Sequence, residues 1–315
     1  MKVLVTGAKG FIGHNLISAL RHINLDVYGT ERVKSDEINF FSVDLKSADW
    51  DKAVSDKDVV IHCAGISSED GSVSDDFELI NVEATKKLAE SCRKHNVKKL
   101  IFLSSAKVMG ESTEPGLPFY SYSALKPIGL YAESKASAEL KLKEELSGSD
   151  VDLIVIRPPL VYGRGVKGNF RTLSSVANLN FPLPIKSVRN SRSLLALDNL
   201  IDFIVTCIMH PTPLNGVFLV SDDCDVSTKE LLEALTLAYG KSPRLLPFPV
   251  SLMRAAAGLF SKHAISDRLL GNLQLDISHT KQTLNWQPKV SFEQAIQDYV
   301  RDELNSSDYT KGSKP

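Results

Sequence analysis

The first half of the chain alternates short apolar runs with longer amphipathic segments, and this alternation restricts the fold more than any other feature. The runs with strand character are Lys2–Thr6, Asp26–Thr30, Phe40–Val43, Asp58–His62, Lys99–Ser104 and Asp152–Arg157. The segments with helical spacing are Phe11–His22, Val82–His95 and Tyr131–Leu146. Strands that are apolar almost throughout are buried on both faces, as in parallel sheets covered by crossover helices. The alternation therefore predicts an α/β fold with a doubly wound parallel sheet.

Composition narrows the class of protein. The 315 residues are 43% hydrophobic and 24% charged, which is typical of a globular protein. Lys and Arg number 37 against 38 Asp and Glu, so the chain has no overall positive field to hold nucleic acid or anionic lipid. The four cysteines form no CxxC pair, so neither a metal site nor a disulfide framework is expected, and a reducing cytoplasm is the expected setting.

Targeting and membrane segments are not expected. The first apolar run stops at Gly7, which is too short for a secretory signal. The apolar stretch Leu252–Phe260 carries Arg254 and falls short of the roughly 20 residues that a bilayer span needs.

A glycine-rich turn follows the first expected strand. It reads Thr6-Gly7-Ala8-Lys9-Gly10-Phe11-Ile12-Gly13 and opens the first expected helix. A dinucleotide pyrophosphate binds at a helix N-terminus, where backbone N–H groups point at the anion and side chains would obstruct it. Glu31, after the second strand, would accept hydrogen bonds from the adenosine ribose and favours NAD, whereas Arg32 could pair with the 2′-phosphate of NADP. The turn predicts a Rossmann-type dinucleotide site, with NAD favoured and NADP left open.

A Ser, Tyr and Lys set supplies the candidate chemistry. Tyr131 and Lys135 are four residues apart, on one face of a helix, and Ser105 follows the fifth strand. A tyrosine with a pKa near 10 is a poor base at neutral pH, but a nearby ammonium favours the phenolate. Tyr131 could then exchange a proton with a sugar hydroxyl while hydride moves to or from the cofactor, and Ser105 could hold the same oxygen.

With these motifs in place, the sequence resembles the extended short-chain dehydrogenase/reductases of the NAD-dependent epimerase/dehydratase type, which act on nucleotide sugars. The resemblance runs from Val3 to about Tyr299. Besides the glycine turn, it rests on Asp44-Leu45, His62-Cys63-Ala64-Gly65, Asn81-Val82, Ser104-Ser105, Tyr131-x-x-x-Lys135 and Arg157-Pro158-Pro159-x-Val161-Tyr162-Gly163.

The resemblance implies roles around the cofactor. Asp44 and Leu45 would contact the adenine, Lys135 would also reach the nicotinamide ribose, and the remaining cofactor-site residues would be Gly7, Gly10, Phe11, Ile12, Gly13, Ala64, Gly65, Asn81, Ser104, Pro158 and Leu160. Asn81 could also cap the helix that follows it. His62 and Cys63 point to opposite faces of a strand and are expected to pack rather than to form a catalytic pair.

The resemblance also implies a substrate site and a dimer. Arg192 would clamp the nucleotide diphosphate with its forked guanidinium, and Arg268 is a second candidate. Lys107 would lie near the sugar, Asn169 would contact the sugar phosphate, Phe170 would place a ring near the base, and Met109 would make the pocket wall more apolar. The helices Tyr131–Leu146 and Val82–His95 would form a homodimer interface.

Three functions remain open. Family dehydratases carry an acidic pair directly after the catalytic Ser or Thr, and Ala106 and Lys107 stand there instead, so a 4,6-dehydratase is not expected. The leading hypothesis is a 4-epimerase acting on a UDP-hexose or UDP-N-acetylhexosamine. The alternatives are a one-way 4-keto-6-deoxy nucleotide-sugar reductase of surface-polysaccharide synthesis and, more remotely, a non-catalytic NAD(P)-binding redox sensor.

The character of the chain changes after Gly163, where Gly, Pro and Asn become denser. One further strand is expected at Val217–Ser221, and a helix from Ser227 to Tyr239 begins with a capping box of Ser227 and Glu230. We expect a dinucleotide-binding domain of residues 1–162 plus about 196–222. A smaller substrate domain would comprise about 163–195 plus 223–305, and 306–315 would form a frayed tail.

Overall fold

A seven-stranded parallel sheet forms the centre of the molecule. The computed structural model describes residues 1–32, 39–67, 74–259 and 269–312. The sheet has the order β3-β2-β1-β4-β5-β6-β9, and every pairing within it is parallel. The strands are β1 (Lys2–Thr6), β2 (Asp26–Glu31), β3 (Phe40–Ser42), β4 (Val59–His62), β5 (Lys99–Leu103), β6 (Asp152–Arg157) and β9 (Gly216–Leu219). This arrangement confirms the predicted Rossmann-type doubly wound sheet.

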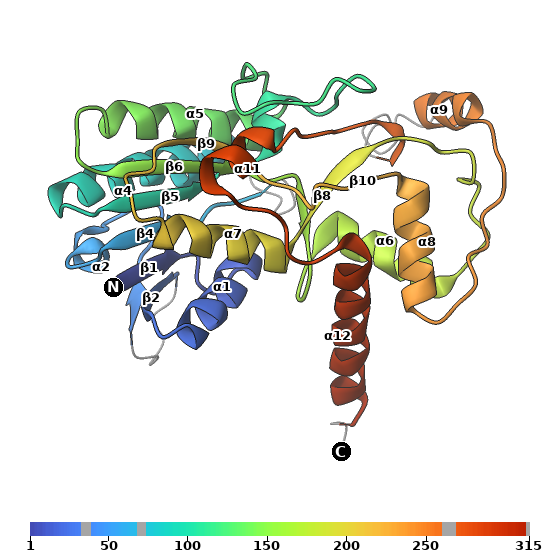
Figure 1. Cartoon of the computed structure of the whole chain (residues 1–315), viewed down its shortest axis with the longest axis horizontal. Coiled ribbons are helices and arrows are strands. Elements are labelled where there is room, and N and C mark those ends of the chain that lie inside the picture. The colour runs from blue at the N-terminus through green and yellow to red at the C-terminus, as the bar shows by residue number, and fades with distance from the viewer. Residues whose placement is uncertain (33–38, 68–73, 260–268, 313–315) are drawn as a thin grey trace.

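Helices cover both faces of this sheet (Figure 1). On one face lie α1 (Phe11–His22) and α7 (Leu197–Met209), and on the other lie α2 (Asp51–Val54), α4 (Ala84–Lys94) and α5 (Leu130–Glu145). Successive residues of a strand point to opposite faces, so Val3 and Val5 join the core beneath α1 while Leu4 joins the core beneath α4. Burial on both faces explains why the strands are apolar throughout.

Two short helical segments lie at the carboxyl edge of the sheet. A π-helix, η1 (Phe77–Glu83), joins α3 (Ser74–Asp76) to α4 without a break, and a 3₁₀-helix, η2 (Ala106–Met109), follows β5. The helix predicted from Val82 therefore begins earlier, and its first turns are π-helical. Single π-helical turns are rare and often mark functional sites.

The second half of the chain adds a smaller lobe, drawn to the right in Figure 1. Its sheet contains β7 (Leu160–Tyr162), β8 (Arg192–Ala196) and β10 (Asp225–Val226), with β8 in the middle. Its helices are α6 (Gly168–Leu179), α8 (Thr228–Ala238), α9 (Val250–Leu259) and α12 (Phe292–Gly312), while α11 (Ser278–Leu284) lies beside β9. The sequence did not predict this three-stranded sheet.

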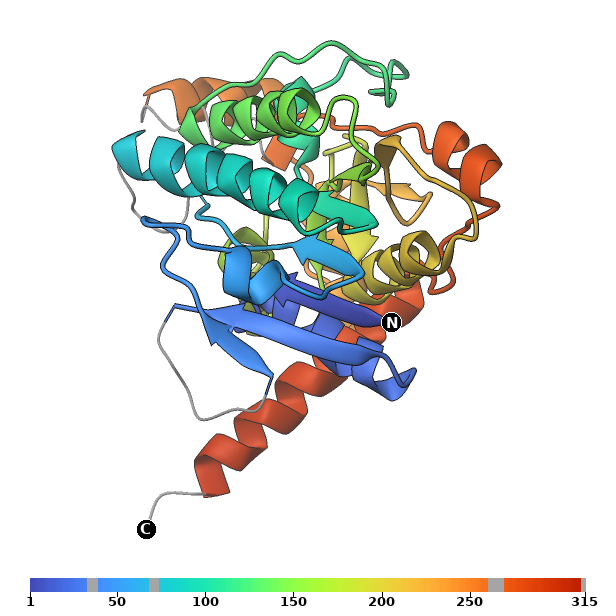
Figure 2. The same cartoon turned by 90° about the vertical axis from the view of Figure 1, so that its left-hand side faces the viewer.

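The bounds of several elements match the sequence analysis. β1, β6 and α1 have the predicted residues, and α8 begins with the predicted capping box between Ser227 and Glu230. The helix α12 continues to Gly312, past the point at which a polar tail is expected to begin, and it projects from the body of the molecule (Figure 2). Among the described residues, no helix has both the length and the apolar character needed to cross a membrane.

Candidate active site

The glycine turn brings backbone close to backbone at the end of β1. Gly7 has φ of +67°, and a Cβ added there would lie 2.9 Å from the Ala64 backbone. A Cβ on Gly13 would lie 2.3 Å from the Gly7 carbonyl oxygen. Among the described residues no side chain caps α1, and its first turn carries no acidic residue. Exposed backbone N–H groups and a positive dipole end without a competing carboxylate suit a pyrophosphate, so the residues present fit a dinucleotide.

Acidic and basic groups meet at the end of β2. The Glu31 side chain is only 6% exposed, and its Oε2 lies 3.9 Å from Lys9 Nζ. Lys9 and Arg21 both lie over the Phe40 ring, at 4.8 and 5.9 Å from its centroid. Arg32 is exposed at this edge. Glu31, the residue expected to bind the adenosine ribose, is thus a buried carboxylate with a lysine nearby.

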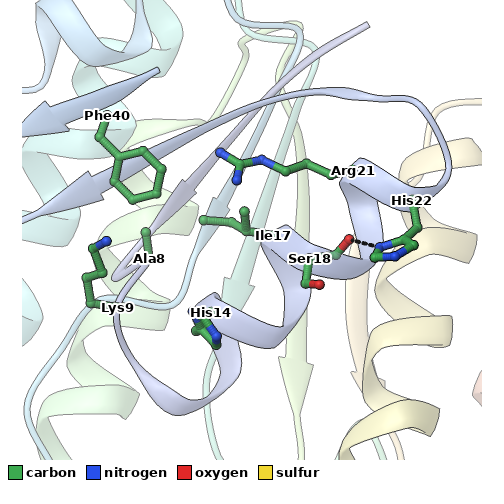
Figure 3. A pocket seen from close by; sticks show the side chains of 8 residues that line it. All are labelled: Ala8, Lys9, His14, Ile17, Ser18, Arg21, His22 and Phe40. Atoms are coloured by element: carbon green, nitrogen blue, oxygen red, sulfur yellow. Dashed lines mark hydrogen bonds between the residues drawn. The ribbon is translucent and has the colours of Figure 1, made fainter. Parts of the chain in front are cut away.

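A hollow of about 270 Å³ lies on the outer side of α1 (Figure 3). It is lined by Ala8, Lys9, His14, Ile17, Ser18, Arg21, His22 and Phe40. Figure 3 shows Lys9 and Arg21 on either side of Phe40 at its rim. The hollow lies beside the glycine turn and shares only Ala8 and Lys9 with it.

Asp44 and Leu45, the expected adenine contacts, form a turn after β3. Asp44 Oδ1 accepts a hydrogen bond from the Lys46 backbone N–H at 3.0 Å, and the Asp44 side chain is exposed. Leu45 packs against a small cluster of Ile66, Phe77 and Ile80, and Tyr131 packs against the same cluster. One apolar cluster thus links the expected adenine contact to the candidate catalytic tyrosine.

Asn81 is a buried linker rather than a helix cap. It lies inside η1, where its Oδ1 accepts from the Ile66 backbone N–H at 2.9 Å. Its Nδ2 donates to the Ile66 carbonyl at 3.0 Å and to Ser134 Oγ at 2.9 Å. The capping role expected for Asn81 is therefore wrong, because the helix is already continuous there. Its expected role as an organiser agrees with these contacts, which tie the loop after β4 to α5.

Ala64 and Gly65 follow β4 as expected. A Cβ on Gly65 would lie 2.9 Å from Asn81 Oδ1 and 3.7 Å from Lys135 Nζ, and Gly65 has φ of +154°. Only a residue without a side chain fits between the buried amide and the buried amine. The loop after β4 therefore packs directly against the residues expected to act in catalysis.

His62 is a neutral structural residue, as expected. Its Nδ1 lies 2.7 Å from Thr6 Oγ1 and its Nε2 lies 2.9 Å from Thr85 Oγ1. Thr6 Oγ1 accepts from the Ala64 N–H and Thr85 donates to the Asn81 carbonyl, so Thr6 donates to Nδ1 and Nε2–H donates to Thr85. Burial, with a smaller contribution from the charge of Lys135, lowers the pKa of His62 to about 3.

The neighbouring Cys63 thiol is also poorly suited to chemistry. Burial raises its pKa to about 12, and all four cysteines of the chain are free. A thiol in that state carries little thiolate at neutral pH.

Ser105 and Lys107 lie at the carboxyl end of β5. Ser105 Oγ accepts a hydrogen bond from the Lys107 backbone N–H at 3.2 Å and so caps η2. The Ser105 residue is half-buried. The Lys107 ammonium donates to Glu111 Oε1 at 2.9 Å. In this structure Lys107 therefore forms an ion pair with Glu111.

Lys135 is the buried cation at the centre of the site. Its Nζ donates to the Leu103 carbonyl at 2.8 Å and lies 4.7 Å from the centroid of the Phe102 ring. Burial lowers the pKa of Lys135 to about 8, against opposing contributions from Cys63 and Glu139. The side chain is therefore still mainly an ammonium at neutral pH. Tyr131 lies one turn earlier in the first turn of α5, half-buried.

A buried ion pair ties α5 to the ends of two strands. Arg157 Nε and Nη2 donate to the two carboxylate oxygens of Glu139 at 2.9 and 2.6 Å, and Ser104 Oγ donates to Glu139 Oε1 at 2.5 Å. The Glu139 side chain is 0% exposed and that of Arg157 is 3% exposed. Glu139 is not among the residues predicted from the sequence, although its position four residues after Lys135, on the same helix face, is a signal for it.

The chain beside this ion pair is also fixed. The Ala106 N–H donates to the Pro158 carbonyl at 2.8 Å, so the segment expected to touch the nicotinamide is held against η2. Leu160 begins β7 and is 40% exposed. These bonds and the ion pair join α5, the end of β5 and the end of β6 at one edge of the sheet.

The residues expected to bind the substrate differ in how far they are exposed. Arg192 begins β8, is half-buried, and donates from Nη1 to the Gly271 carbonyl at 3.1 Å. Asn169 is exposed in the first turn of α6. Arg268 lies outside the described residues.

Two expectations about the substrate site are wrong. Phe170 is 0% exposed and packs in the core of the smaller lobe, where its ring stacks on Tyr162 at 5.0 Å, so it cannot reach a base. Met109 is 1% exposed and packs in the hydrophobic core, so it does not form an open pocket wall. Among the described residues, no group of three or more His, Cys, Asp or Glu side chains could hold a metal ion.

Comparisons with known proteins agree with this geometry. Residues 3–219 match the sequence model of the family described as the NAD dependent epimerase/dehydratase family. A UDP-glucose 4-epimerase from Vibrio cholerae is 39% identical over 309 residues, which cover 93% of each chain.

Solved structures show the same fold. The UDP-glucose 4-epimerase of Thermotoga maritima, determined with UDP-glucose, has a TM-score of 0.77 at 22% identity and covers 98% of this chain and all of its own. The UDP-glucose 4-epimerase of Thermus thermophilus, determined in complex with NAD, has a TM-score of 0.77 at 23% identity, with coverage of 97% and 100%.

Proposed function

Because the chain belongs to the NAD-dependent epimerase/dehydratase family, we propose that it is a 4-epimerase that acts on a UDP-hexose or UDP-N-acetylhexosamine. The observation that carries the proposal is the placement of Lys135. This buried ammonium lies between the end of β5 and Gly65, one helical turn from Tyr131. The similarity to the Vibrio cholerae epimerase over 93% of both chains supports the same activity.

The cofactor in this proposal is NAD. When bound, NAD supplies the chemistry of accepting a hydride from C4 and returning it. Gly7, Gly10 and Gly13, with the backbone of Phe11 and Ile12, would hold the pyrophosphate, and Glu31 would hold the adenosine ribose. The exposed Arg32 is the residue through which NADP could compete.

In this mechanism the phenolate of Tyr131 takes the proton from the C4 hydroxyl and later gives it back. The ammonium of Lys135 stabilises the phenolate by its opposite charge. Ser105 donates a hydrogen bond to the C4 oxygen both while it is a hydroxyl and while it is a ketone, because the one proton of the C4 hydroxyl points to Tyr131. The three residues are held by η2 and α5, which pack against each other.

The smaller lobe would bind the nucleotide sugar. In this proposal residues 1–162 and about 196–222 bind NAD, and about 163–195 and 223–305 bind the substrate. Arg192 would fork onto the diphosphate, Asn169 would contact the sugar phosphate, and Lys107 would reach the sugar after leaving Glu111. An epimerase needs a site in which the 4-keto sugar can rotate, so that either face of the C4 carbonyl can receive the hydride.

Dehydration is not part of this proposal. The two positions after Ser105 are Ala106, which is buried, and Lys107, which is a cation. Neither can serve as the carboxylate and carboxylic acid pair that removes a proton and expels a hydroxyl.

The direct test is to incubate the protein with UDP-glucose, UDP-galactose and their N-acetylated forms, with no reduced nicotinamide added. We expect each C4 pair to interconvert, as measured by NMR of the sugars. Stoichiometric oxidation of added NADH or NADPH by a 4-keto-6-deoxy sugar, with no interconversion, would identify a one-way reductase instead. Bound cofactor without turnover of any sugar would favour a redox sensor.

We also propose that the protein is a homodimer through α4 and α5 and works in the reducing cytoplasm. The exposed Leu140 on α5 is compatible with the dimer interface. The four free cysteines are compatible with a reducing compartment. Light scattering should give a dimer mass, and Leu140→Arg should lower it. A monomeric wild-type protein would contradict the dimer.

A further inference from the structure

The balance of charge over the whole chain conceals a strong local asymmetry. Residues 153–197 contain seven Lys and Arg and no Asp or Glu. Residues 234–266 contain four Lys and Arg and again no Asp or Glu. The chain as a whole carries 37 basic and 38 acidic residues, so two acid-free stretches of this length are far from its average.

The structure brings parts of these two stretches together. Leu183 and Leu245 are partners in a parallel bridge. The Leu183 N–H donates to the Arg244 carbonyl at 2.9 Å, and the Leu246 N–H donates to the Leu183 carbonyl at 2.8 Å. The two segments run along the edge of the smaller lobe that faces away from the seven-stranded sheet (Figure 1). The helix α9 continues this edge directly from the second segment.

Large apolar side chains are exposed along this edge. Phe181 is 63% exposed, Leu246 is 53%, Phe248 is 40% and Leu252, on α9, is 55%. We call these four residues the apolar edge. Single exposed apolar residues are ordinary, but four on adjoining segments, two of them phenylalanines, offer apolar area of the kind that binds a partner.

Exposed cations accompany the apolar edge. Lys186 and Arg244 lie on the two paired segments, and Arg254 lies on α9. Since the sequence on these segments offers no carboxylate, none of these cations has an acidic neighbour within its own segment. Apolar side chains beside basic ones, on a short surface helix, are the composition of segments that bind in the headgroup region of a bilayer.

We propose that the apolar edge, with Lys186, Arg244 and Arg254, docks the protein onto an anionic lipid surface. The apolar side chains would enter the boundary between headgroups and acyl chains, and the cations would pair with lipid phosphates. This attachment is peripheral and agrees with the absence of a membrane-spanning helix among the described residues. It would hold the smaller lobe at the bilayer while the sheet and its cofactor site stay in water.

The test is flotation of the full chain with vesicles of phosphatidylcholine mixed with phosphatidylglycerol, compared with vesicles of phosphatidylcholine alone. We expect binding to the mixed vesicles that weakens as salt is raised, and at least tenfold less binding to the neutral ones. The single variants Lys186→Gln and Arg244→Gln should each lower the partition coefficient about fivefold. The double variant Leu246→Ser/Phe248→Ser should lower it at least tenfold.

The matched controls are Met209→Ser, which removes a 58% exposed apolar residue at the end of α7, and Lys52→Gln, which removes an exposed cation on α2. Both should bind vesicles as the wild type does. All variants should keep wild-type turnover of nucleotide sugars and wild-type melting, because the changed side chains are exposed and lie outside the candidate active site. The vesicle experiment therefore tests the docking proposal independently of the proposed epimerase activity.

Three results would overturn the proposal. One is the absence of flotation at low salt, and another is equal flotation of the control and edge variants. The third is a fall in molecular mass of the Leu246→Ser/Phe248→Ser variant without lipid, which would make the edge an interface between copies of the chain.

Discussion

The two lobes position their functional groups in different ways. At the carboxyl edge of the large sheet, the important groups are buried and locked by named partners: Gly7 against the Ala64 backbone, Lys135 on the Leu103 carbonyl, and Glu139 between Arg157 and Ser104. In the smaller lobe, Asn169 is exposed and Arg192 is half-buried. The side proposed to bind the cofactor is thus preorganised by packing, whereas the side proposed to bind the substrate presents side chains to solvent.

This difference predicts where substitutions act. Changes on the cofactor side should cost folding stability as well as activity, because each group there also holds the fold together. Changes on the substrate side should act mainly on binding. The following substitutions test this contrast, from the largest expected effect to the smallest.

Glu139→Gln should be the most destabilising of these changes. It leaves the buried Arg157 guanidinium without its opposite charge, and breaking a buried pair in this way costs about 3–5 kcal/mol. Chemical denaturation gives the free energy of unfolding. The control is Glu144→Gln on the same helix, whose exposed pair with Lys141 should contribute less than about 1 kcal/mol. Equal losses of stability in the two variants would show that the buried ion pair of Glu139 and Arg157 does not stabilise the fold more than an exposed pair does.

Gly7→Ala should impair both NAD binding and stability. The added Cβ would lie 2.9 Å from the Ala64 backbone, so overpacking adds about 1–3 kcal/mol to the strain of a positive φ. Gly148 is a matched control, since its φ is +69° and no described heavy atom lies within 4 Å of an added Cβ. Gly148→Ala should show the strain alone and keep wild-type NAD affinity by calorimetry. A loss of NAD binding in both variants would mean that backbone strain, and not the close approach, is responsible.

Protonation of His62 should destabilise the protein at acid pH. The folded protein lowers the pKa of His62 to about 3, below its ordinary value of 6.5, so the unfolded chain binds the proton more readily. The contribution to stability is therefore complete above about pH 6.5 and is lost as the pH falls toward 3, at no more than about 1.4 kcal/mol for each unit of pH. Unfolding measured across this range should show a steeper decline for the wild type than for His62→Gln. If the free energies of unfolding of the two proteins fall in parallel with pH, groups other than His62 cause the loss of stability at acid pH.

Arg192→Lys should have the smallest effect and the most selective one. A lysine keeps the charge but cannot fork onto two phosphate oxygens, so KM for the nucleotide sugar should rise about fivefold to tenfold with little change in kcat or in melting temperature. Arg189→Lys, an exposed neighbour, is the control. A fall in kcat, or a clear loss of stability, would show that Arg192 belongs with the preorganised residues.

Much of the large sheet was predictable because burial on both faces leaves an apolar sequence. β1 and β6 have the predicted bounds for this reason. The glycine turn was predictable because only glycine permits the close approach of Gly7 and Gly13 to backbone atoms. In these places a single physical requirement dictates the residue type.

Other features depend on contacts between distant residues, which local patterns do not record. The sequence around Asn81 is consistent with a cap, but its amide is used by Ile66 and Ser134 instead. Phe170 stands next to a polar Asn in a basic stretch, yet its ring fills the core of the smaller lobe. The ion pair of Glu139 joins residues 18 positions apart and forms only when α5 packs on the sheet.

The most direct test of the central claim uses the Tyr131→Phe variant loaded with NAD. If Tyr131 is the proton acceptor and Lys135 its electrostatic partner, the variant should bind NAD and melt like the wild type. It should interconvert UDP-glucose and UDP-galactose about 10²–10⁴-fold more slowly. Reduced nicotinamide, seen by absorbance after UDP-sugar is added, should form in the wild type and be nearly absent in the variant. Interconversion at close to the wild-type rate, with NAD still bound, would contradict the account.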